Sequence, residues 1–272
     1  MITMKWVDNM QIKKFIIFSN NTKLSIELKD KVKEKLEKAN FIENKKSFDL
    51  AIAIGGDGCF LRMVKETKFN SRVLYVGINT GTLGFAQEVK VDDIDNFINN
   101  LIIENYKIDN IGIQETKVIT SVNTFYFNSL NEIVIRDKNL NTLTLDVMID
   151  SVKLEKFVGD GMLVATSFGS TAYNLSFGGS IVYNTFHTLQ LTPIAPLNNM
   201  SYRNLLNSVI IPEEKKIFII PKNKDLLIQV DGDNNIYDNV SLIETYIHKK
   251  RIKCYRDKNY DFSKKINEKF LK

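Results

Sequence analysis

The sequence feature that most restricts the fold is a run of apolar residues at 50–54, Leu-Ala-Ile-Ala-Ile, that leads into Gly55-Gly56-Asp57-Gly58. A strand that is apolar on consecutive residues is typical of a sheet covered on both faces. The apolar positions that follow, from about 60 to 69, predict a helix. A buried strand, a glycine loop and a helix in this order favour an α/β fold with a parallel sheet.

The same alternation of strand and helix extends over the first ~105 residues. Strands are expected at residues 15–18 and 73–78. Asp92 is expected to cap a helix that carries Ile94, Phe97, Ile98 and Leu101. Another amphipathic helix is predicted by apolar residues at every fourth position, Leu24, Leu28, Val32 and Leu36. The N-terminal part is therefore predicted to be a parallel sheet with flanking helices.

The pattern changes after Tyr106. Residues 143–149 alternate between apolar and polar side chains, which is typical of a half-buried strand. Further strand-like runs lie at 117–122, 125–127, 133–135, 163–165, 217–220 and 226–230, and few helical stripes appear. A chain of 272 residues is long enough for two domains. We therefore expect an α/β domain at 1–110 and a β-rich domain at 111–252.

Composition excludes several classes of protein. The net charge of +5 is a small excess of 37 basic over 32 acidic residues, so the basic stretch at 249–258 is interpreted as a solvated surface rather than a site for nucleic acid. No run approaches the ~20 apolar residues of a membrane helix, and no signal peptide is evident. Two cysteines and two histidines provide neither a disulfide framework nor a metal site. We expect a cytoplasmic protein without membrane or nucleic-acid partners.

The glycine loop is the first candidate for chemistry. Gly55, Gly56 and Gly58 let backbone N–H groups approach a phosphate at the start of a helix. Asp57 would repel that phosphate unless it holds magnesium or accepts a proton from a hydroxyl, and both roles belong to phosphoryl transfer. Arg62, one helical turn further on, is a second phosphate-binding candidate. The alternative is a tight turn with a surface aspartate.

Two further segments carry polar groups in a pattern suited to a ligand. Residues 159–179 place an apolar strand between an acidic glycine turn and a hydroxyl-rich one, and Tyr173 offers a ring for stacking. Asn131 and Glu132 lie where a predicted strand begins, and the alternation of that strand would bury one of the two side chains. A core tyrosine and a capped strand end are the simpler interpretations. Residues 231–235 lack the glycine and glutamate of a calcium loop and are interpreted as a hairpin turn.

Five motifs in order resemble the NAD kinase family. They are Gly55-Gly56-Asp57-Gly58, residues 79–85 (Asn-Thr-Gly-Thr-Leu-Gly-Phe), Asn131-Glu132, residues 159–179, and residues 191–196 (Leu-Thr-Pro-Ile-Ala-Pro). Each motif alone is weak, whereas the ordered set is specific. The resemblance covers roughly residues 12 to 255.

The resemblance implies a fold and a reaction. The fold has an α/β N-terminal domain, a β-rich C-terminal domain, and a final segment at about 253–272 that packs back on the first domain. NAD would bind in the crevice between the domains, and ATP or polyphosphate with Mg²⁺ or another divalent cation would be the phosphoryl donor. The product would be NADP, and the assembly a homodimer or homotetramer.

The resemblance also implies a role for each matching residue. Asp57 would activate the 2′-hydroxyl of the adenosine ribose, while Gly55, Gly56, Gly58 and Arg62 would face phosphate. Asn131 and Glu132 would hold the adenine and ribose, and Asp160 the nicotinamide end. The remaining cofactor-binding residues would be Phe85, Thr171, Ala172, Tyr173, Asn174, Leu175, Ser176 and Ala195.

Two alternatives stay open at this point. A lipid kinase of the diacylglycerol or sphingosine type resembles this family through the same Gly-Gly-Asp-Gly loop. The pocket of a lipid kinase should, however, be apolar rather than rich in hydroxyls. A non-catalytic dinucleotide sensor would gain nothing from Asp57 beside phosphates. The sequence also leaves open the phosphoryl donor, the choice between NAD and NADH, the regulation, the choice between dimer and tetramer, and a start at Met1, Met4 or Met10.

Overall fold

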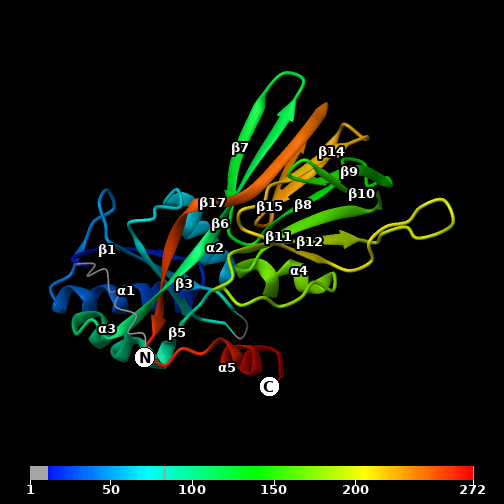
Figure 1. The fold of residues 1–272 in the computed structure, drawn as a ribbon. Helices are drawn as coiled ribbons and strands as arrows, with labels where there is room; N and C mark the ends of the chain where they lie inside the picture. The colour runs from blue at the N-terminus through cyan, green and yellow to red at the C-terminus, as the bar shows by residue number, and fades with distance from the viewer. Residues whose placement is uncertain (1–11, 82–83, 272) are drawn as a thin grey trace. The chain divides into compact units, whose positions relative to one another are not determined.

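The computed structural model describes residues 12–81 and 84–271, and its chain forms two compact units (Figure 1). One unit consists of the chain up to Asp109 together with the segment from Ile252 onward, and the other of Asn110–Arg251. Two positions of the 79–85 motif, Thr82 and Leu83, and the alternative starts at Met1, Met4 and Met10 lie outside the described residues.

The first unit is built on a parallel sheet, as the sequence predicts. Its strands run in the order β2-β1-β3-β4, and all of the pairs are parallel. The C-terminal part of β17 adds a further parallel neighbour to β4. Every residue of β3 is buried, which confirms the strand expected to be covered on both faces. The strands are β1 (Lys14–Ser19), β2 (Ile42–Glu43), β3 (Leu50–Gly55), β4 (Leu74–Asn79), β5 (Val89–Lys90) and β17 (Val240–Asp257).

The helices of this unit bury apolar stripes against the sheet. In α1 (Lys23–Lys38) the buried residues are Ser25, Leu28, Val32 and Leu36, so the predicted stripe is right except that Leu24 is exposed. The other elements are α2 (Asp57–Glu66), η1 (Val91–Asp93), α3 (Ile94–Ile102), α5 (Phe262–Ile266) and η3 (Asn267–Leu271). Among the described residues no helix has the length and apolar character needed to cross a bilayer.

The start of α3 differs from the prediction. Asp92 does not cap this helix, because residues 91–93 form a separate turn of 3-10 helix and the capping position is taken by Asp93. No side-chain hydrogen bond is made there. The expected apolar face is present, with Ile94, Phe97, Ile98 and Leu101 all buried.

The second unit is a β-rich body made of two packed sheets. One sheet has the order β13-β12-β11-β8-β15-β16. In the other, β10, β9, β14 and β17 are neighbours, and β6 pairs with β17 and β7. A single apolar core takes side chains from both sheets, for example Ile133 and Val164 from the first and Leu145 and Ile243 from the second. This arrangement explains the period-two pattern of β9, because Leu143, Leu145 and Val147 point to that core.

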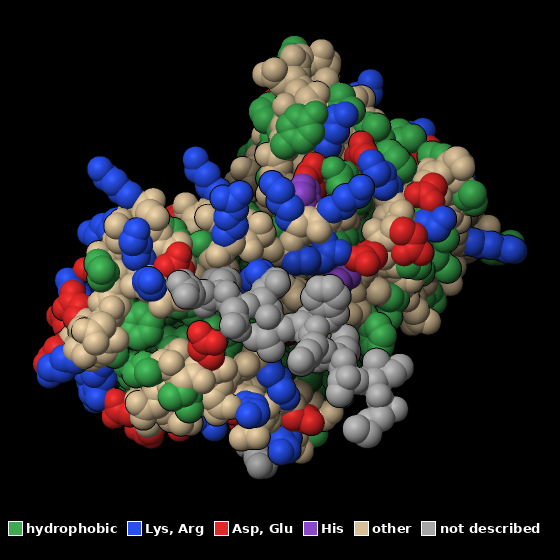
Figure 2. Space-filling view, turned by 60° about the vertical axis from the view of Figure 1, so that its left-hand side comes forward, with side chains coloured by type: hydrophobic (Ala, Val, Ile, Leu, Met, Phe, Trp, Pro, Cys, Tyr) green, Lys and Arg blue, Asp and Glu red, His purple; other side chains and the backbone are tan. Residues whose placement is uncertain are grey.

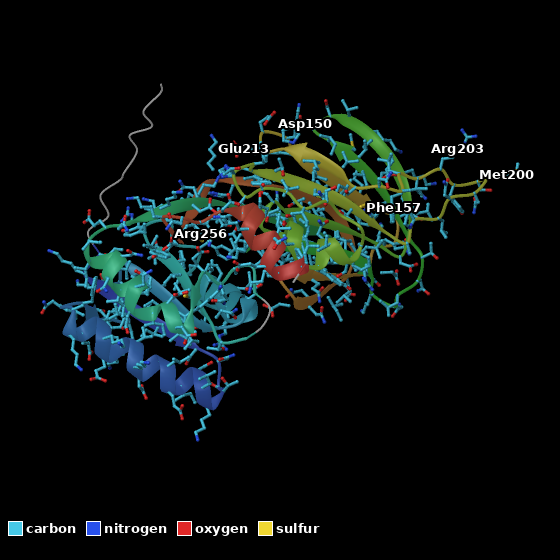
Figure 3. All side chains as sticks on the ribbon, turned by 90° about the horizontal axis from the view of Figure 1, so that it is seen from below. Asp150, Phe157, Met200, Arg203, Glu213 and Arg256 are labelled. Atoms are coloured by element: carbon cyan, nitrogen blue, oxygen red, sulfur yellow. The ribbon has the colours of Figure 1, made fainter. Side chains whose placement is uncertain are left out.

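The bounds of this unit's elements follow. Its strands are β6 (Tyr106–Thr120), β7 (Thr124–Ser129), β8 (Glu132–Asp137), β9 (Leu143–Ile149), β10 (Val152–Gly159), β11 (Gly161–Thr166), β12 (Thr188–Ile194), β13 (Val209–Pro212), β14 (Ile217–Pro221), β15 (Leu226–Val230) and β16 (Asp233–Tyr237). Two short helices, η2 (Phe168–Thr171) and α4 (Tyr173–Ser176), follow β11. Met200 and Arg203 lie at the far end of the long connection between β12 and β13 (Figure 3).

The surface carries mixed charge. On the face shown in Figure 2, Lys and Arg side chains stand among acidic and uncharged ones. The basic stretch at 249–258 is not uniformly exposed, because Lys249 and Lys250 face solvent whereas Arg256 is 2% exposed.

The buried stripe of α1 gives the first prediction. Leu36→Ala should lower the free energy of unfolding by about 2–5 kcal/mol, because it removes a fully buried side chain and leaves a cavity. Leu24→Ala on the same helix is the control and should change it by less than about 0.5 kcal/mol, since Leu24 is exposed. Urea unfolding measures both, and equal losses would contradict the assigned face.

Candidate active site

The glycine loop joins the C-terminal end of β3 to the N-terminus of α2. The strand ends at Gly55, Gly56 is the N-capping residue, and Asp57 is the first helical residue. A Cβ atom at Gly56 or Gly58 would have no described heavy atom within 4 Å, so the backbone here faces open space. The free N–H groups of a helix's first turn suit an anion. A phosphate therefore fits at this end of the parallel sheet, where α/β folds bind ligands.

The Asp57 carboxylate is held by two backbone amides. Phe85 N–H donates to Oδ2 at 2.8 Å and Ala86 N–H donates to Oδ1 at 3.0 Å. Each carboxylate oxygen can accept more than one hydrogen bond, so these contacts fix the orientation of the group and leave it able to accept another. The side chain is half-buried. The geometry suits a carboxylate that accepts a proton from a hydroxyl.

Arg62 and Phe85 both lie in this unit, with definite partners. The Arg62 guanidinium donates to the Ser19 carbonyl at 2.7 Å, at the C-terminal end of β1, and remains exposed. The Phe85 ring stacks on Phe270, with centroids 5.1 Å apart, and meets the edge of Phe262 at 6.0 Å. Arg62 thus lies at the strand ends where phosphate is expected, while Phe85 is partly covered by the C-terminal segment.

The residues of the loop fit a magnesium ion carried by phosphates. Within 12–81 and 84–271, no three His, Cys, Asp or Glu side chains are grouped as in a protein-only metal site. Mg²⁺ is commonly bound through one or two carboxylates together with substrate phosphates and water. Asp57 is the one carboxylate of the glycine loop. These residues therefore do not form a cage for the metal, but they are compatible with a metal that arrives with the donor.

In the second unit, three strand ends meet at one edge of the six-stranded sheet. β8 begins at Glu132, which pairs with Ala165 near the end of β11, and Ile133 pairs with Val230 at the end of β15. Thr166 N–H donates to the Asn131 carbonyl at 2.8 Å. A Cβ atom on Gly169 would lie 2.1 Å from the same oxygen, so only glycine fits there. This edge brings Asn131 and Glu132 beside η2.

Glu132 is buried and incompletely satisfied. Its side chain is 6% exposed, and its Oε2 atom has no hydrogen-bond partner among the described residues. Burial, and to a lesser extent the neighbouring Asp231 charge, raises the pKa of Glu132 to about 8. A buried oxygen without a partner is uncommon, and a ligand hydroxyl would satisfy it.

Asp231 has a role that the sequence motifs did not predict. Its carboxylate accepts the N–H groups of Leu130 and Asn131, both at 2.8 Å, and that of Glu132 at 3.2 Å. Asp231 and Gly232 have φ of 47° and 93° and form the turn between β15 and β16, so the predicted hairpin is confirmed. An acidic residue directly after an apolar strand was the signal that could have indicated this role.

The predicted residues of the 168–176 region differ in exposure. Asn174 is fully buried, and its amide group is bound to Gln190 at 2.7 Å and Thr192 at 2.6 Å, so it holds the segment together from within. Tyr173 is 39% exposed, with its hydroxyl 3.4 Å from Arg136. Thr171, Ala172 and Leu175 are half-buried and Ser176 is exposed. These residues, rather than the Asn174 amide, are available to a ligand.

Asp160 and Ala195 lie together at the other end of β11. Asp160 N–H donates to the Ile194 carbonyl at 3.0 Å, next to Ala195, whose φ of 44° is unusual for a non-glycine residue. Both residues are exposed. The six residues of β11 separate Asp160 from Thr166 by about 20 Å at roughly 3.4 Å per residue. The predicted residues of this unit thus spread along the sheet, which suits an elongated ligand.

A glycine-lined helix N-terminus with a fixed carboxylate suits a protein that binds phosphate. Sequence comparison specifies the family. A model of the ATP-NAD kinase N-terminal domain matches residues 8–106, and one of the C-terminal domain matches residues 130–251. The chain is 41% identical over 251 residues to an NAD kinase of Finegoldia magna, covering 86% of this chain and 90% of that protein. An NAD kinase of Streptococcus gordonii is 36% identical, over 88% of both chains. The chain belongs to the NAD kinase family.

Solved structures share the fold. A yeast NADH kinase complexed with NADH matches with a TM-score of 0.81 at 22% identity, covering 96% of this chain and 87% of that one. An NAD kinase from Archaeoglobus fulgidus in complex with ATP matches with a TM-score of 0.71 at 20% identity, covering 90% and 94%. The predicted fold class, an α/β N-terminal domain plus a β-rich C-terminal domain, is confirmed.

The buried Glu132 predicts how stability depends on pH. Its pKa is about 8 in the folded chain and 4.5 ordinarily, so between these values the native state binds more protons than the unfolded state. Stability should therefore fall as pH rises, by an amount on the order of 2 kcal/mol between pH ~5.5 and ~8.

Urea unfolding of Glu132→Gln checks this expectation, because the variant keeps the shape and cannot titrate. Its stability should vary less with pH over this interval than that of the natural chain, while other groups with shifted pKa values, such as Asp231, whose pKa is also raised by burial, should still contribute. Parallel pH dependences of the two proteins would contradict the assignment.

Proposed function

We propose that the protein transfers a phosphoryl group from ATP or polyphosphate to the 2′-hydroxyl of the adenosine ribose of NAD, giving NADP. Family membership supports the overall reaction, and the relatives named NAD kinase give no support to a lipid kinase or a non-catalytic sensor. The observation that carries the residue assignment is the Asp57 carboxylate, fixed by two amides beside an open glycine loop.

Asp57 is the proposed general base. As the ribose oxygen attacks the terminal phosphorus, its proton passes to a free lone pair of the Asp57 carboxylate, and the bond between that phosphorus and the leaving phosphate breaks. The amides of Phe85 and Ala86 hold the carboxylate so that it need not reorient during this step. Positioning of this kind accounts for much of the catalysis of phosphoryl transfer.

The donor is proposed to bind at Gly55, Gly56 and Gly58, with Arg62 nearby. The open space at Gly56 and Gly58 gives phosphate oxygens access to the first-turn N–H groups of α2. A divalent cation, when bound with the donor, supplies compensation of the phosphate charge. The proposed donor and catalytic-loop domain is therefore residues 1–110 together with about 253–272.

The β-rich domain, residues 111–252, is proposed to bind NAD. Glu132 offers an unpartnered oxygen and Asn131 an adjacent amide for the adenine and ribose. Asp160 is proposed to hold the nicotinamide end and Ala195 to line the pocket, and Phe85 is proposed as a further cofactor-binding residue. Thr171, Ala172, Tyr173, Leu175 and Ser176 are exposed or half-buried and are proposed to line the site. We further propose a cytoplasmic homodimer or homotetramer, and buried free cysteines are consistent with a reducing compartment.

Replacing the carboxylate tests the assignment. Asp57→Asn should reduce NADP formation by at least ~100-fold, because the amide cannot accept the ribose proton. NAD affinity should stay within about tenfold, since the change is confined to the chemical step. Turnover measured by product formation and binding measured by calorimetry separate the two effects.

Asp30→Asn is the matched control, because it makes the same change at an exposed carboxylate of α1 in the same unit. It should turn over at the natural rate. An Asp57→Asn protein that keeps its fold by circular dichroism and still forms NADP at the natural rate would overturn the proposed role.

The donor and acceptor are separated by a substrate panel. The purified protein is incubated with magnesium and each pairing of NAD or NADH with ATP or polyphosphate. A 2′-phosphorylated product from at least one pairing is expected, and the pairings that react identify the substrates. No such product from any pairing would contradict the proposed function.

A further inference from the structure

A buried charged cluster lies within the first unit, outside the glycine loop. The Glu88 carboxylate is 3.1 Å from the Lys265 ammonium and 3.6 Å from the Arg256 guanidinium, which is labelled in Figure 3. It also accepts the N–H of Asp257 at 3.3 Å. The side chains of Glu88, Lys265 and Arg256 are 7%, 10% and 3% exposed. Burying charged groups is unfavourable unless they are paired and hydrogen-bonded, so this arrangement fixes the positions of its members.

Lys265 also binds the backbone of the segment that holds Asp57. Its ammonium donates to the Gln87 carbonyl at 2.9 Å. Gln87 directly follows Ala86, whose N–H donates to the Asp57 carboxylate. One side chain of the C-terminal segment therefore anchors two consecutive residues, Gln87 through its carbonyl and Glu88 through its carboxylate.

Gln87 makes a second connection to the glycine loop. Its Nε2 atom donates to the Gly56 carbonyl at 2.7 Å, at the residue immediately before Asp57. Gly77 of β4 leaves room for this side chain, because a Cβ atom there would lie 1.9 Å from Gln87 Oε1. The segment from Phe85 to Glu88 thus contacts Asp57 by its amides, Gly56 by the Gln87 side chain, and Lys265 by the Gln87 carbonyl and the Glu88 carboxylate.

Other contacts of the C-terminal segment also hold the segment from Phe85 to Glu88. Phe270 and Phe262 pack on the Phe85 ring.

Burial, and after it the Arg256 charge, lowers the pKa of Lys265 to about 8, whereas the negative charges of Glu88 and Asp57 favour the ammonium. The ring of Tyr260 lies 5.5 Å from the same ammonium. At neutral pH the group is therefore still a charged donor.

We propose that Lys265 is a positioning residue for the reaction: through Gln87 and Glu88 it fixes the backbone amides that orient the Asp57 carboxylate. This inference rests on the proposed function, in which Asp57 receives the ribose proton. A displaced segment would misdirect the carboxylate and so act mainly on the chemical step.

The test compares Lys265→Met, which keeps most of the side-chain volume and removes the charge, with Lys264→Met, the same change at the exposed neighbouring lysine. Lys265→Met should lower kcat about 10- to 100-fold, because small misplacements of catalytic groups have effects of this size. KM for NAD should change less than about threefold, since Phe85 is one of many residues proposed to bind NAD whereas Asp57 is the single proposed base. Lys264→Met should match the natural chain, and Lys265→Arg should recover part of the lost kcat.

Gln87→Met provides a second variant in case Lys265→Met does not fold. It keeps the backbone carbonyl that Lys265 binds and removes the link to Gly56, so it should also lower kcat. In the double variant the losses should be less than multiplicative, because both residues act on one segment. Natural kcat in a folded Lys265→Met protein would overturn the proposal, and so would fully multiplicative losses in the double variant, because they would show that the two residues do not act on one segment.

Hydrogen exchange tests the positioning role without turnover. The amides of Phe85 and Ala86 are hydrogen-bonded to Asp57. They should exchange faster in Lys265→Met than in the natural chain, whereas their exchange in Lys264→Met should be unchanged. Unchanged exchange in Lys265→Met would contradict the proposal. If the natural chain forms no NADP, the proposed function fails, whereas this measurement still decides whether Lys265 orders the segment.

Discussion

The first unit depends on a carboxylate placed at the start of a helix and bound there by amides from another part of the chain. Asp57 begins α2, where a negative charge is favourable with respect to the helix dipole. Two amides from the segment that follows β4 then determine where its oxygens point. The parallel pairing of β3 with β4 makes this possible, because both strands end at the same edge of the sheet. The chemistry proposed for the chain follows from that one placement.

The second unit also contains hydrogen bonds between a carboxylate and backbone amides, but there they fix the backbone. Asp231 accepts three consecutive amides at the start of β8 and so fixes the backbone of Asn131 and Glu132. Glu132 is then buried with one oxygen unpartnered among the described residues, a state that is unfavourable unless a ligand satisfies it. In the first unit backbone amides orient a carboxylate, whereas in the second a carboxylate orders backbone amides and the neighbouring Glu132 oxygen is left available.

The sequence predicted those features that local patterns encode. The consecutive apolar residues of β3, the glycine loop, the hairpin at 231–235 and the period-two strands each depend on neighbours along the chain, and the structure contains them. Contacts between distant residues were not predictable from such patterns. Leu130 and Asp231 are 101 residues apart, and Gln87 and Lys265 are 178 apart. The errors at Leu24 and Asp92 are local, since a helix face and a helix start can each shift by one residue without changing the apolar period.

The most direct test of the central claim is to locate the transferred phosphate on the product. Phosphorus NMR of the reaction of the natural chain with NAD, magnesium and the active donor should show a new phosphomonoester coupled to the 2′ position of the adenosine ribose. A phosphate on any other oxygen of NAD, or release of inorganic phosphate alone, would contradict the account.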